Sequence, residues 1–195
     1  MRSIKQEIRI LGFDDAPFKP RSHEKVLVIG VIYRGGNFLD GIIKTEITGD
    51  ELDATKRIIQ VVNKSRHKEE LRVLMFKGIT IGGFNIIDIK KLYEKTDLPI
   101  IVIARKKPNL KKIKKALKNF DDFEKRWEFI RNAGKIYKMK IKKNKSLYYQ
   151  FIGLKRDEVE KIISLSCTRS LIPEPLRVSH LIASAMVKGE SKGRA

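Results

Sequence analysis

The chain has 195 residues and a mass of 22.5 kDa, the size of one domain. Hydrophobic residues make up 42% of it, which excludes wholesale disorder, and its single cysteine, Cys167, excludes a disulfide framework and a cysteine-rich zinc site. No apolar run reaches the roughly 20 residues that span a bilayer, and the first residues lack the apolar stretch of a signal peptide. We therefore expect a cytoplasmic protein without a membrane partner.

Positive charge is the first indication of a partner. The formal net charge is +20, and the chain has 18 basic and 14 acidic residues up to Leu98 but 25 basic and 9 acidic residues after it. This asymmetry favours a nucleic acid, DNA or RNA, bound mainly through the C-terminal half. The alternative is a basic surface that is merely solvated.

The first third of the chain predicts three antiparallel strands. An apolar run at residues 7–13 is followed, after a loop at 16–24, by a β-branched run at 25–34 that is typical of a central strand. The Gly35-Gly36 pair then turns the chain into a third strand at 37–47. Because short turns join these segments, we expect an antiparallel meander.

The rest of the chain mixes helices and strands. Helices are predicted at 50–67 and 85–95, alternating with buried strands at 71–76 and 99–104. This alternation implies parallel pairing with covering helices. There follow helices at 110–119 and 121–133, a basic hairpin at 135–152 that turns at Lys143-Asn144-Lys145, helices at 156–166 and 175–187, and a tail at 188–195. The order predicts a single α/β domain of the ribonuclease H-like class, residues 1–195.

Two adjacent carboxylates, Asp14 and Asp15, follow the first predicted strand. Strand interiors disfavour Asp, and neighbours on a strand project to opposite faces, so one of the two can face the open edge of the sheet. Their mutual repulsion would raise a pKa, and a divalent cation would remove that penalty. The pair is therefore a candidate metal site. The alternative is an Asx turn at the start of the loop.

A second acidic cluster, Asp50 and Asp53, opens the helix after the third strand. Helix capping explains acidic residues there equally well, but the strand order could bring them beside the end of the first strand. Glu46 competes with Asp50 as a ligand. Oxygen donors with few His or Cys favour Mg²⁺ or Mn²⁺. The predicted metal ligands are Asp14, Asp15 and Asp50, with Asp53 secondary.

A glycine-rich segment, residues 77–85, joins a predicted strand to a helix. Gly82 and Gly83 would let backbone N–H groups approach a nucleic acid, and a helix start such as Asn85 favours an anion. The segment matches neither a Walker A loop nor a dinucleotide fingerprint, and a tight turn explains it equally well. Asp88 either faces the same way as Asn85, as a secondary site residue, or lies exposed.

Residues 105–118 carry eight positive charges and no acid, and their apolar positions leave one face basic. Lysines neutralise phosphates without reading sequence. The nucleic-acid contacts predicted here are Arg105, Lys106, Lys107, Lys111, Lys112 and Lys115. Tyr137, Tyr148 and Tyr149 of the hairpin either stack on exposed bases or pack within the hairpin.

The segment at residues 171–180 is the last candidate. Pro175 can start a helix, with Arg177 on the first turn and His180 one turn later. Arg177 and His180 are predicted nucleic-acid contacts, whereas the alternative is a capped helix with His180 in a helix–helix contact. Cys167 fits a buried thiol better than a nucleophile.

Four motifs together resemble one family. They are Gly12-Phe13-Asp14-Asp15, Asp50 with Asp53-Ala54-Thr55, Gly78-Ile79-Thr80 running into Gly82-Gly83-Phe84-Asn85, and Pro173-Glu174-Pro175-Leu176-Arg177. They resemble the largely archaeal, endonuclease V-like family also called endonuclease dU, over nearly the whole chain. The resemblance implies a ribonuclease H-like fold and metal-dependent cleavage of DNA near deaminated bases such as deoxyuridine.

The chain departs from endonuclease V itself at a position that matters for the metal. There, carboxylates after strand one, near the end of strand three and at the end of the next strand hold the ion. Asp14 matches the first and Asp50 or Glu46 the second, but Lys77-Gly78 stands where endonuclease V has Asp-Gly. The resemblance thus implies that Lys77 pairs with a phosphate oxygen as a fixed cation.

Two further features of endonuclease V lack a match. Its Pro-Tyr-rich wedge has no clear counterpart, and its histidine is expected to be replaced in the region of Cys167 and Thr168.

The main hypothesis is a Mg²⁺- or Mn²⁺-dependent endonuclease acting on DNA with deaminated bases, with Asp14, Asp15, Asp50 and Lys77 as catalytic residues. One alternative is a non-catalytic RNA- or DNA-binding protein on the same scaffold, which Lys77 favours. Another is a nucleotide-handling enzyme that uses the glycine loop.

Overall fold

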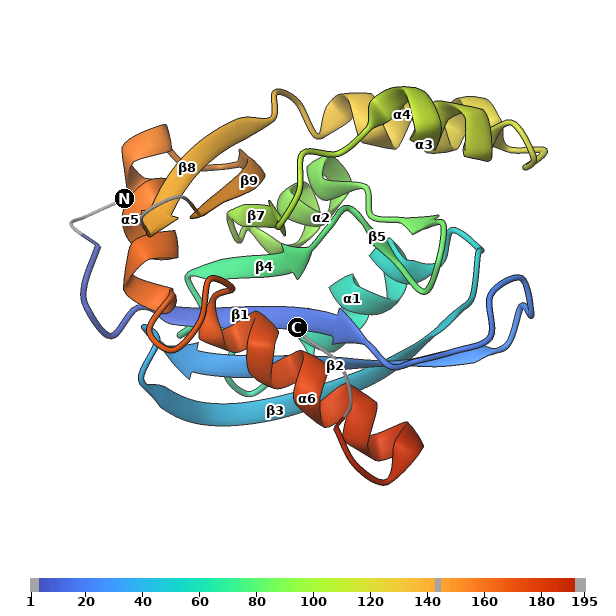
Figure 1. Ribbon diagram of the computed structural model, residues 1–195. Coiled ribbons are helices and arrows are strands. Elements are labelled where there is room, and N and C mark those ends of the chain that lie inside the picture. Colours follow the sequence, from blue (N-terminus) through green and yellow to red (C-terminus); the bar gives the residue numbers. More distant parts are fainter. Residues whose placement is uncertain (1–3, 143–144, 192–195) are drawn as a thin grey trace.

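The computed structural model describes residues 4–142 and 145–191, and its centre is a seven-stranded mixed sheet (Figure 1). The first three strands form an antiparallel meander, β1 and β4 are parallel, as are β4 and β7, and β9 returns antiparallel to β7. Across the sheet the strands are β3 (Phe38–Thr48), β2 (Lys25–Arg34), β1 (Arg9–Asp15), β4 (Val73–Lys77), β7 (Ile100–Ala104), β9 (Lys145–Ile152) and β8 (Tyr137–Lys142).

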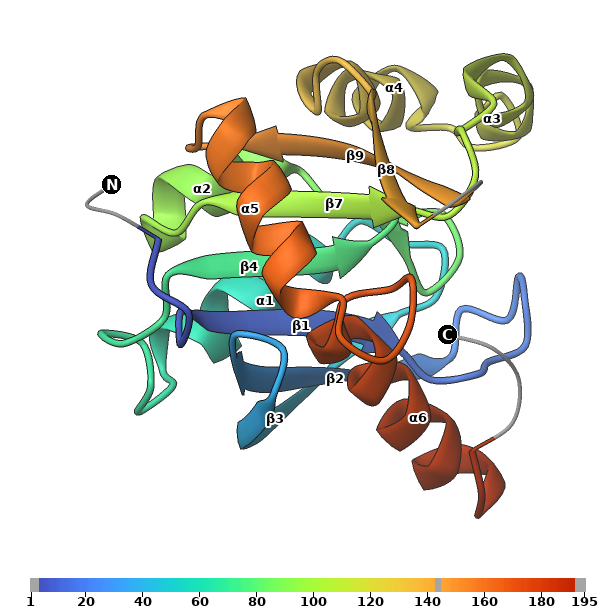
Figure 2. The ribbon, with the colours of Figure 1, turned by 60° about the vertical axis from the view of Figure 1, so that its left-hand side comes forward.

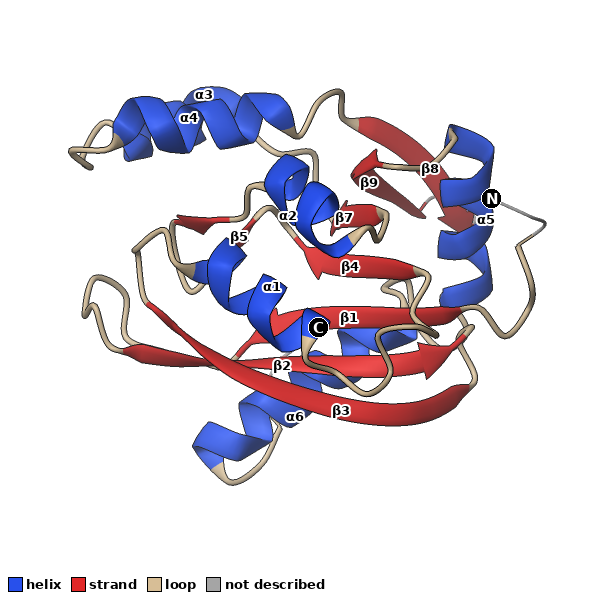
Figure 3. Ribbon diagram, turned by 180° about the vertical axis from the view of Figure 1, so that it is seen from behind, coloured by secondary structure: helices blue, strands red, loops and turns tan. Residues whose placement is uncertain are grey.

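Helices cover both faces of this sheet. Figure 3 shows α1 (Ala54–Asn63) and α2 (Ile89–Thr96) on one face, and Figure 2 shows α5 (Arg156–Ser166) and α6 (Glu174–Lys188) on the other. The pair α3 (Leu110–Leu117) and α4 (Phe123–Asn132) lies beyond the β7 and β9 side of the sheet (Figure 1). In the described part of the chain, no helix is both long and apolar enough to cross a membrane.

The central strands β1, β2, β4 and β7 are nearly continuous apolar runs because both of their faces are buried. Leu11 and Phe13 of β1 pack into the core shared with α1 and α2, whereas Ile10 packs into the core under α5. Phe13 stacks on Phe76 of β4, with ring centroids 5.3 Å apart. This packing on both faces sets the position of the end of β1, where Asp14 and Asp15 stand.

The helix predicted at residues 85–95 begins only at Ile89. Ahead of it, β5 (Thr80–Ile81) and β6 (Asn85–Ile86) form a small antiparallel hairpin. Its turn passes through Gly82 and Gly83 at φ +57° and +84°, which glycine adopts without steric cost. The expected strand-to-helix loop is therefore a glycine hairpin.

The helix predicted at residues 50–67 is shorter than expected, since α1 begins at Ala54. Asp50 takes a left-handed φ of +57°, which delays the start of the helix. At the other end of the chain, α6 runs to Lys188 and stops at Gly189, so the predicted tail begins one residue late. The rest of that tail, residues 192–195, and residues 143–144 of the predicted hairpin turn lie outside the described residues.

Candidate active site

The two adjacent carboxylates stand at the carboxyl end of β1. Its parallel neighbours β4 and β7 end on the same side of the sheet, at Lys77 and Ala104. In open α/β sheets, ligands bind outside the carboxyl ends of the strands. Asp14 lies opposite Ile29 and Asp15 opposite Val28 in β2, and at this end of the strand both carboxylates border one small space together with Lys77.

Asp14 is the centre of a three-residue contact. It is buried, with 6% of its surface exposed, and its Oδ2 lies 2.9 Å from Nδ1 of His180 and 3.4 Å from Nζ of Lys77. Nε2 of His180 is buried and finds no hydrogen-bond partner among the described residues. Because a carboxylate only accepts hydrogen bonds, Nδ1 carries the proton and Nε2 is left unused.

Glycine brings His180 to this position. A Cβ on Gly12 would lie 2.6 Å from Cβ of Pro175, so the start of α6 can rest on β1 only because Gly12 has no side chain. Two of the motifs singled out in the sequence, the one at Gly12 and the one at Pro175, are thus the two sides of one packing contact. This contact sets how closely α6, and with it His180, approaches Asp14.

A buried carboxylate fixes the start of α6. Glu174 is 2% exposed, and it accepts hydrogen bonds from the backbone N–H of Arg169 and from the guanidinium of Arg177. Arg177, a predicted nucleic-acid contact, is therefore paired within the protein. Its position supports the helix that carries His180.

Asp15 turns towards the glycine hairpin. Its Oδ2 accepts a hydrogen bond of 2.9 Å from the backbone N–H of Gly82. Burial, together with the neighbouring negative charge of Asp14, raises the pKa of Asp15 to about 6. The carboxylate pair therefore lacks compensating positive charge, even with Lys77 beside it.

Asp50 holds the other side of the same turn. Its Oδ1 accepts from the N–H of Phe84 at 2.8 Å and its Oδ2 from the N–H of Arg21 at 3.0 Å. The described residues contain no group of three or more His, Cys, Asp or Glu side chains placed to hold a metal. The structure thus brings Asp14 and Asp15 together and leaves the predicted third ligand, Asp50, on the hairpin turn.

The remaining acidic candidates have structural contacts. Asp53 accepts hydrogen bonds from the backbone of Thr48 and from the side chain of Asn85, so it ties β3 to the hairpin. Asp88 caps α2 through the N–H of Lys91. Glu46 is exposed on the edge strand β3 and lies opposite Leu27, away from the carboxylate pair.

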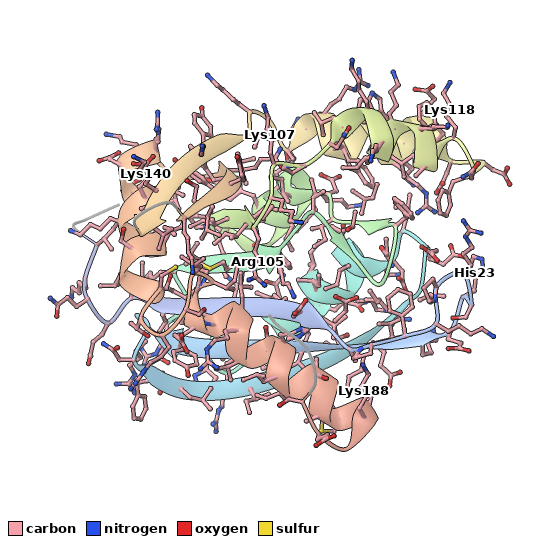
Figure 4. All side chains as sticks on the ribbon, viewed as in Figure 1. His23, Arg105, Lys107, Lys118, Lys140 and Lys188 are labelled. Atoms are coloured by element: carbon pink, nitrogen blue, oxygen red, sulfur yellow. The ribbon has the colours of Figure 1, made fainter. Side chains whose placement is uncertain are left out.

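A large basic cavity adjoins the carboxylates. It has a volume of about 1,040 Å³ and shares Lys77 and Gly78 with a small cavity formed around Asp14 and Asp15. Its lining includes the predicted contacts Arg105, Lys106 and Lys107, and also Lys138, Lys145 and Tyr148 of the basic β8–β9 hairpin. Figure 4 shows Lys107 near this hairpin and Lys118 at the far end of α3, whose exposed lysines include Lys111, Lys112 and Lys115.

A histidine from α6 reaches the carboxylates, while Cys167 and Thr168, where the histidine of endonuclease V is expected to be replaced, make other contacts. That histidine is His180, whereas Cys167 lies against the carbonyl of Leu171 and Thr168 donates a hydrogen bond to the carbonyl of Gly36. The sequence places His180 on the helix that Pro175 starts. Only the packing of α6 on β1 shows that this histidine contacts Asp14.

Sheet, helices and edge site together define a mixed α/β protein with the ribonuclease H-like fold of endonuclease V. A crystal structure of Ciona intestinalis endonuclease V, in complex with a 24mer DNA containing an inosine, matches with a TM-score of 0.62 and 13% identity, over 93% of this chain and 87% of that one. The model of the Endonuclease dU family matches residues 6–187, and the chain belongs to this family.

Two relatives are more similar. A UPF0215 protein from Methanothermobacter thermautotrophicus is 51% identical over 195 residues, which is 100% of this chain and 95% of the relative. A crystal structure of a protein from Archaeoglobus fulgidus has a TM-score of 0.84 and 37% identity, and the match covers 93% of this chain and 99% of that one.

Proposed function

We propose that this protein is a metal-dependent endonuclease that hydrolyses phosphodiester bonds in DNA containing deaminated bases such as deoxyuridine. The observation that carries the proposal is the pair of adjacent carboxylates at the carboxyl end of β1, buried Asp14 and half-buried Asp15, with Lys77 and His180 both in contact with Asp14. Family membership and the endonuclease V fold support the same reaction.

The donor set fits Mg²⁺ or Mn²⁺. Mg²⁺ is usually held by one or two carboxylates, with water and substrate phosphate completing its shell. Asp14 and Asp15 provide two carboxylates. The pKa of Asp15 is raised by burial first and by the charge of Asp14 second, and a cation would compensate the second of these effects. When bound there, such an ion lowers the pKa of a water molecule and stabilises negative charge on the phosphate.

His180 is a positioning residue in this proposal. Its Nδ1 donates a hydrogen bond to Oδ2 of Asp14 and so fixes the orientation of this carboxylate. Its Nε2 is buried and has no hydrogen-bond partner among the described residues, so the ring acts on the site through Asp14.

Lys77 supplies a fixed positive charge. Its side chain is 27% exposed and borders both the carboxylates and the basic cavity, so it can reach a phosphate oxygen. There it would stabilise the charge that develops on the phosphate during cleavage. This role explains how the site works with a cation where endonuclease V has a carboxylate.

The experiment compares cleavage of a labelled oligonucleotide that contains one deoxyuridine with that of the same oligonucleotide containing thymidine. Both are incubated with wild type, Asp14→Asn and His180→Ala, in Mg²⁺, in Mn²⁺ and in EDTA. We expect cleavage of the deoxyuridine strand only with metal, a loss of at least about 100-fold in Asp14→Asn and a loss of about 10–100-fold in His180→Ala. The matched control Glu46→Gln should cleave like wild type. Equal cleavage by Asp14→Asn and wild type contradicts the proposal.

One observation favours a second candidate, a non-catalytic nucleic-acid-binding protein. Lys77 already gives Asp14 a cationic partner, and the described residues offer only two adjacent carboxylates instead of a three-ligand cluster. This candidate predicts tight binding of DNA or RNA that EDTA does not weaken, without cleavage under any of the metal conditions above.

A further inference from the structure

We infer that the basic cavity beside Asp14 binds a short run of unpaired nucleotides, with one base stacked on Tyr148 and the phosphates held by the surrounding lysines. This inference rests on the proposed nuclease function and extends it, because it specifies an unpaired strand as the form of substrate that reaches the carboxylates.

The size of the cavity fits a few nucleotides. Its volume of about 1,040 Å³ is comparable to the roughly 300–1,000 Å³ of pockets that enclose most of a drug-sized ligand. An unpaired strand is favoured because its bases expose their faces for stacking, whereas the bases of a duplex are stacked on one another.

The charge of the lining favours a polyanion. Its described residues include six basic side chains and no acidic one: Lys77, Arg105, Lys106, Lys107, Lys138 and Lys145. They come from the end of β4, from the loop after β7 and from the β8–β9 hairpin, so they surround the space from several sides. Lysine and arginine side chains neutralise the phosphates of a strand without reading its base sequence.

Tyr148 provides the surface for a base. Tyr137, Tyr149 and Phe151 of the same hairpin stack on one another, with centroid distances of 5.5–6.0 Å, and pack into the core under α5. Tyr148 projects to the opposite face, opposite Lys138 and Ala104, where it lines the cavity. The aromatic side chains of the hairpin thus divide into a packed group and one ring on the cavity side. Stacking of an unpaired base on such a ring contributes about 1–3 kcal/mol.

The location connects the cavity to the chemistry. Lys77 lines the cavity and lies 3.4 Å from Asp14, so a strand in the cavity passes its backbone next to the carboxylates. Leu171, from the loop that leads into α6, is also part of the lining.

The test measures fluorescence anisotropy of labelled DNA of about 12 nucleotides, single-stranded or as the matching duplex, with full-length protein in EDTA. Tyr148→Ala should weaken single-strand binding about tenfold and duplex binding by less than about twofold. Tyr148→Phe keeps the ring and should bind within about twofold of wild type. The thermal unfolding of both variants is measured alongside.

A matched pair of lysine variants tests the walls of the cavity independently. Lys138→Gln should weaken single-strand binding and lower the slope of log Kd against log salt concentration by about 1, whereas Lys90→Gln on α2, outside the lining, should change neither. The inference is overturned if Tyr148→Ala weakens duplex binding as much as single-strand binding, or if the two lysine variants behave alike.

The two proposals can fail separately. Because binding is measured in EDTA, a protein that cleaves no substrate but binds single strands through Tyr148 keeps the cavity assignment and loses the nuclease assignment. A protein that cleaves the deoxyuridine strand normally but binds single strands equally well with and without the Tyr148 ring keeps the nuclease assignment and loses the cavity assignment.

Discussion

At the scale of single residues, the candidate site contains two adjacent carboxylates that lower the stability of the folded protein. Asp14 and Asp15 are largely buried side by side, and Lys77 compensates only part of their charge. In the metal-free protein, ionisation of Asp15 therefore lowers the stability of the folded state. Buried groups whose pKa is shifted by burial and by a like charge are typical of functional sites.

Asp15→Asn should stabilise the metal-free protein at neutral pH. The pKa of Asp15 rises from 3.8 to about 6 on folding, so its contribution to stability is complete below pH 3.8 and is lost as the pH rises through about 6. Asn has no charge to lose and still accepts from the N–H of Gly82. We expect a gain of about 1–3 kcal/mol at about pH 7.5 and none at about pH 4, from urea unfolding in EDTA. A variant that is less stable at both pH values contradicts this.

Two features oppose a side chain at Gly83: its backbone conformation and the neighbouring side chain of Asp50. An added Cβ would lie 2.3 Å from Oδ1 of Asp50, at a φ of +84°. Gly134 has a similar φ of +75° with nothing within 4 Å, so Gly134→Ala isolates the backbone cost of about 1–2 kcal/mol. Gly83→Ala should cost at least about 2 kcal/mol more, because Asp50 must release Phe84. Equal unfolding free energies for the two variants contradict the close approach.

At the scale of elements, the contact between α6 and β1 assembles the site. Gly12 admits Pro175, Glu174 fixes the start of the helix, and His180 then reaches Asp14. The glycine hairpin β5–β6 is held in the same way from two sides, by Asp15 and by Asp50. The acidic residues singled out in the sequence thus divide into the pair that we propose for chemistry and others that position elements.

Removal of Glu174 tests the start of α6. Glu174→Ala leaves the partly exposed guanidinium of Arg177 without its carboxylate and the N–H of Arg169 without an acceptor. We expect a loss of about 2–3 kcal/mol in urea unfolding. Arg57→Ala, which breaks the exposed pair with Asp53, should cost less than about 1 kcal/mol. Similar losses in both variants would mean that Glu174 contributes no more than a surface ion pair.

At the scale of the whole molecule, the basic cavity, the candidate active site and the exposed lysines of α3 adjoin one another. The basic cavity borders the carboxylates at the end of the sheet, and α3 adds exposed lysines beyond it. A molecule with a net charge of +20 attracts any nucleic acid at long range. The cavity then decides which form of strand reaches Asp14.

Neutralising α3 should reduce affinity without changing the form of nucleic acid that is preferred. In the variant Lys111→Gln, Lys112→Gln, Lys115→Gln we expect the slope of log Kd against log salt concentration to fall by about 3, for single strands and duplexes alike. The matched variant Lys90→Gln, Lys91→Gln, Lys95→Gln on α2 should bind like wild type. A selective loss of single-strand binding in the α3 variant contradicts this division of roles.

Much of the fold could be predicted because it depends on local patterns. The β-branched run of β2 and the apolar runs of β4 and β7 are buried on both faces, so their sequences are apolar throughout. The predicted start of α2 at Asn85 was wrong because the side chain of Asn85 is held by distant partners, the carbonyl of Thr48 and the carboxylate of Asp53. Such bonds between residues more than 30 positions apart leave no periodic trace in a sequence.

The sequence by itself determined the positive charge of the C-terminal half and the adjacency of Asp14 and Asp15, because composition and covalent order do not depend on folding. Only the tertiary structure decided which side chains share the site. His180 meets Asp14 across 166 positions, and Asp50 accepts from the backbone of the hairpin turn that Asp15 also binds. The physical reason is packing: whether α6 approaches β1 depends on the space left by the missing side chain of Gly12.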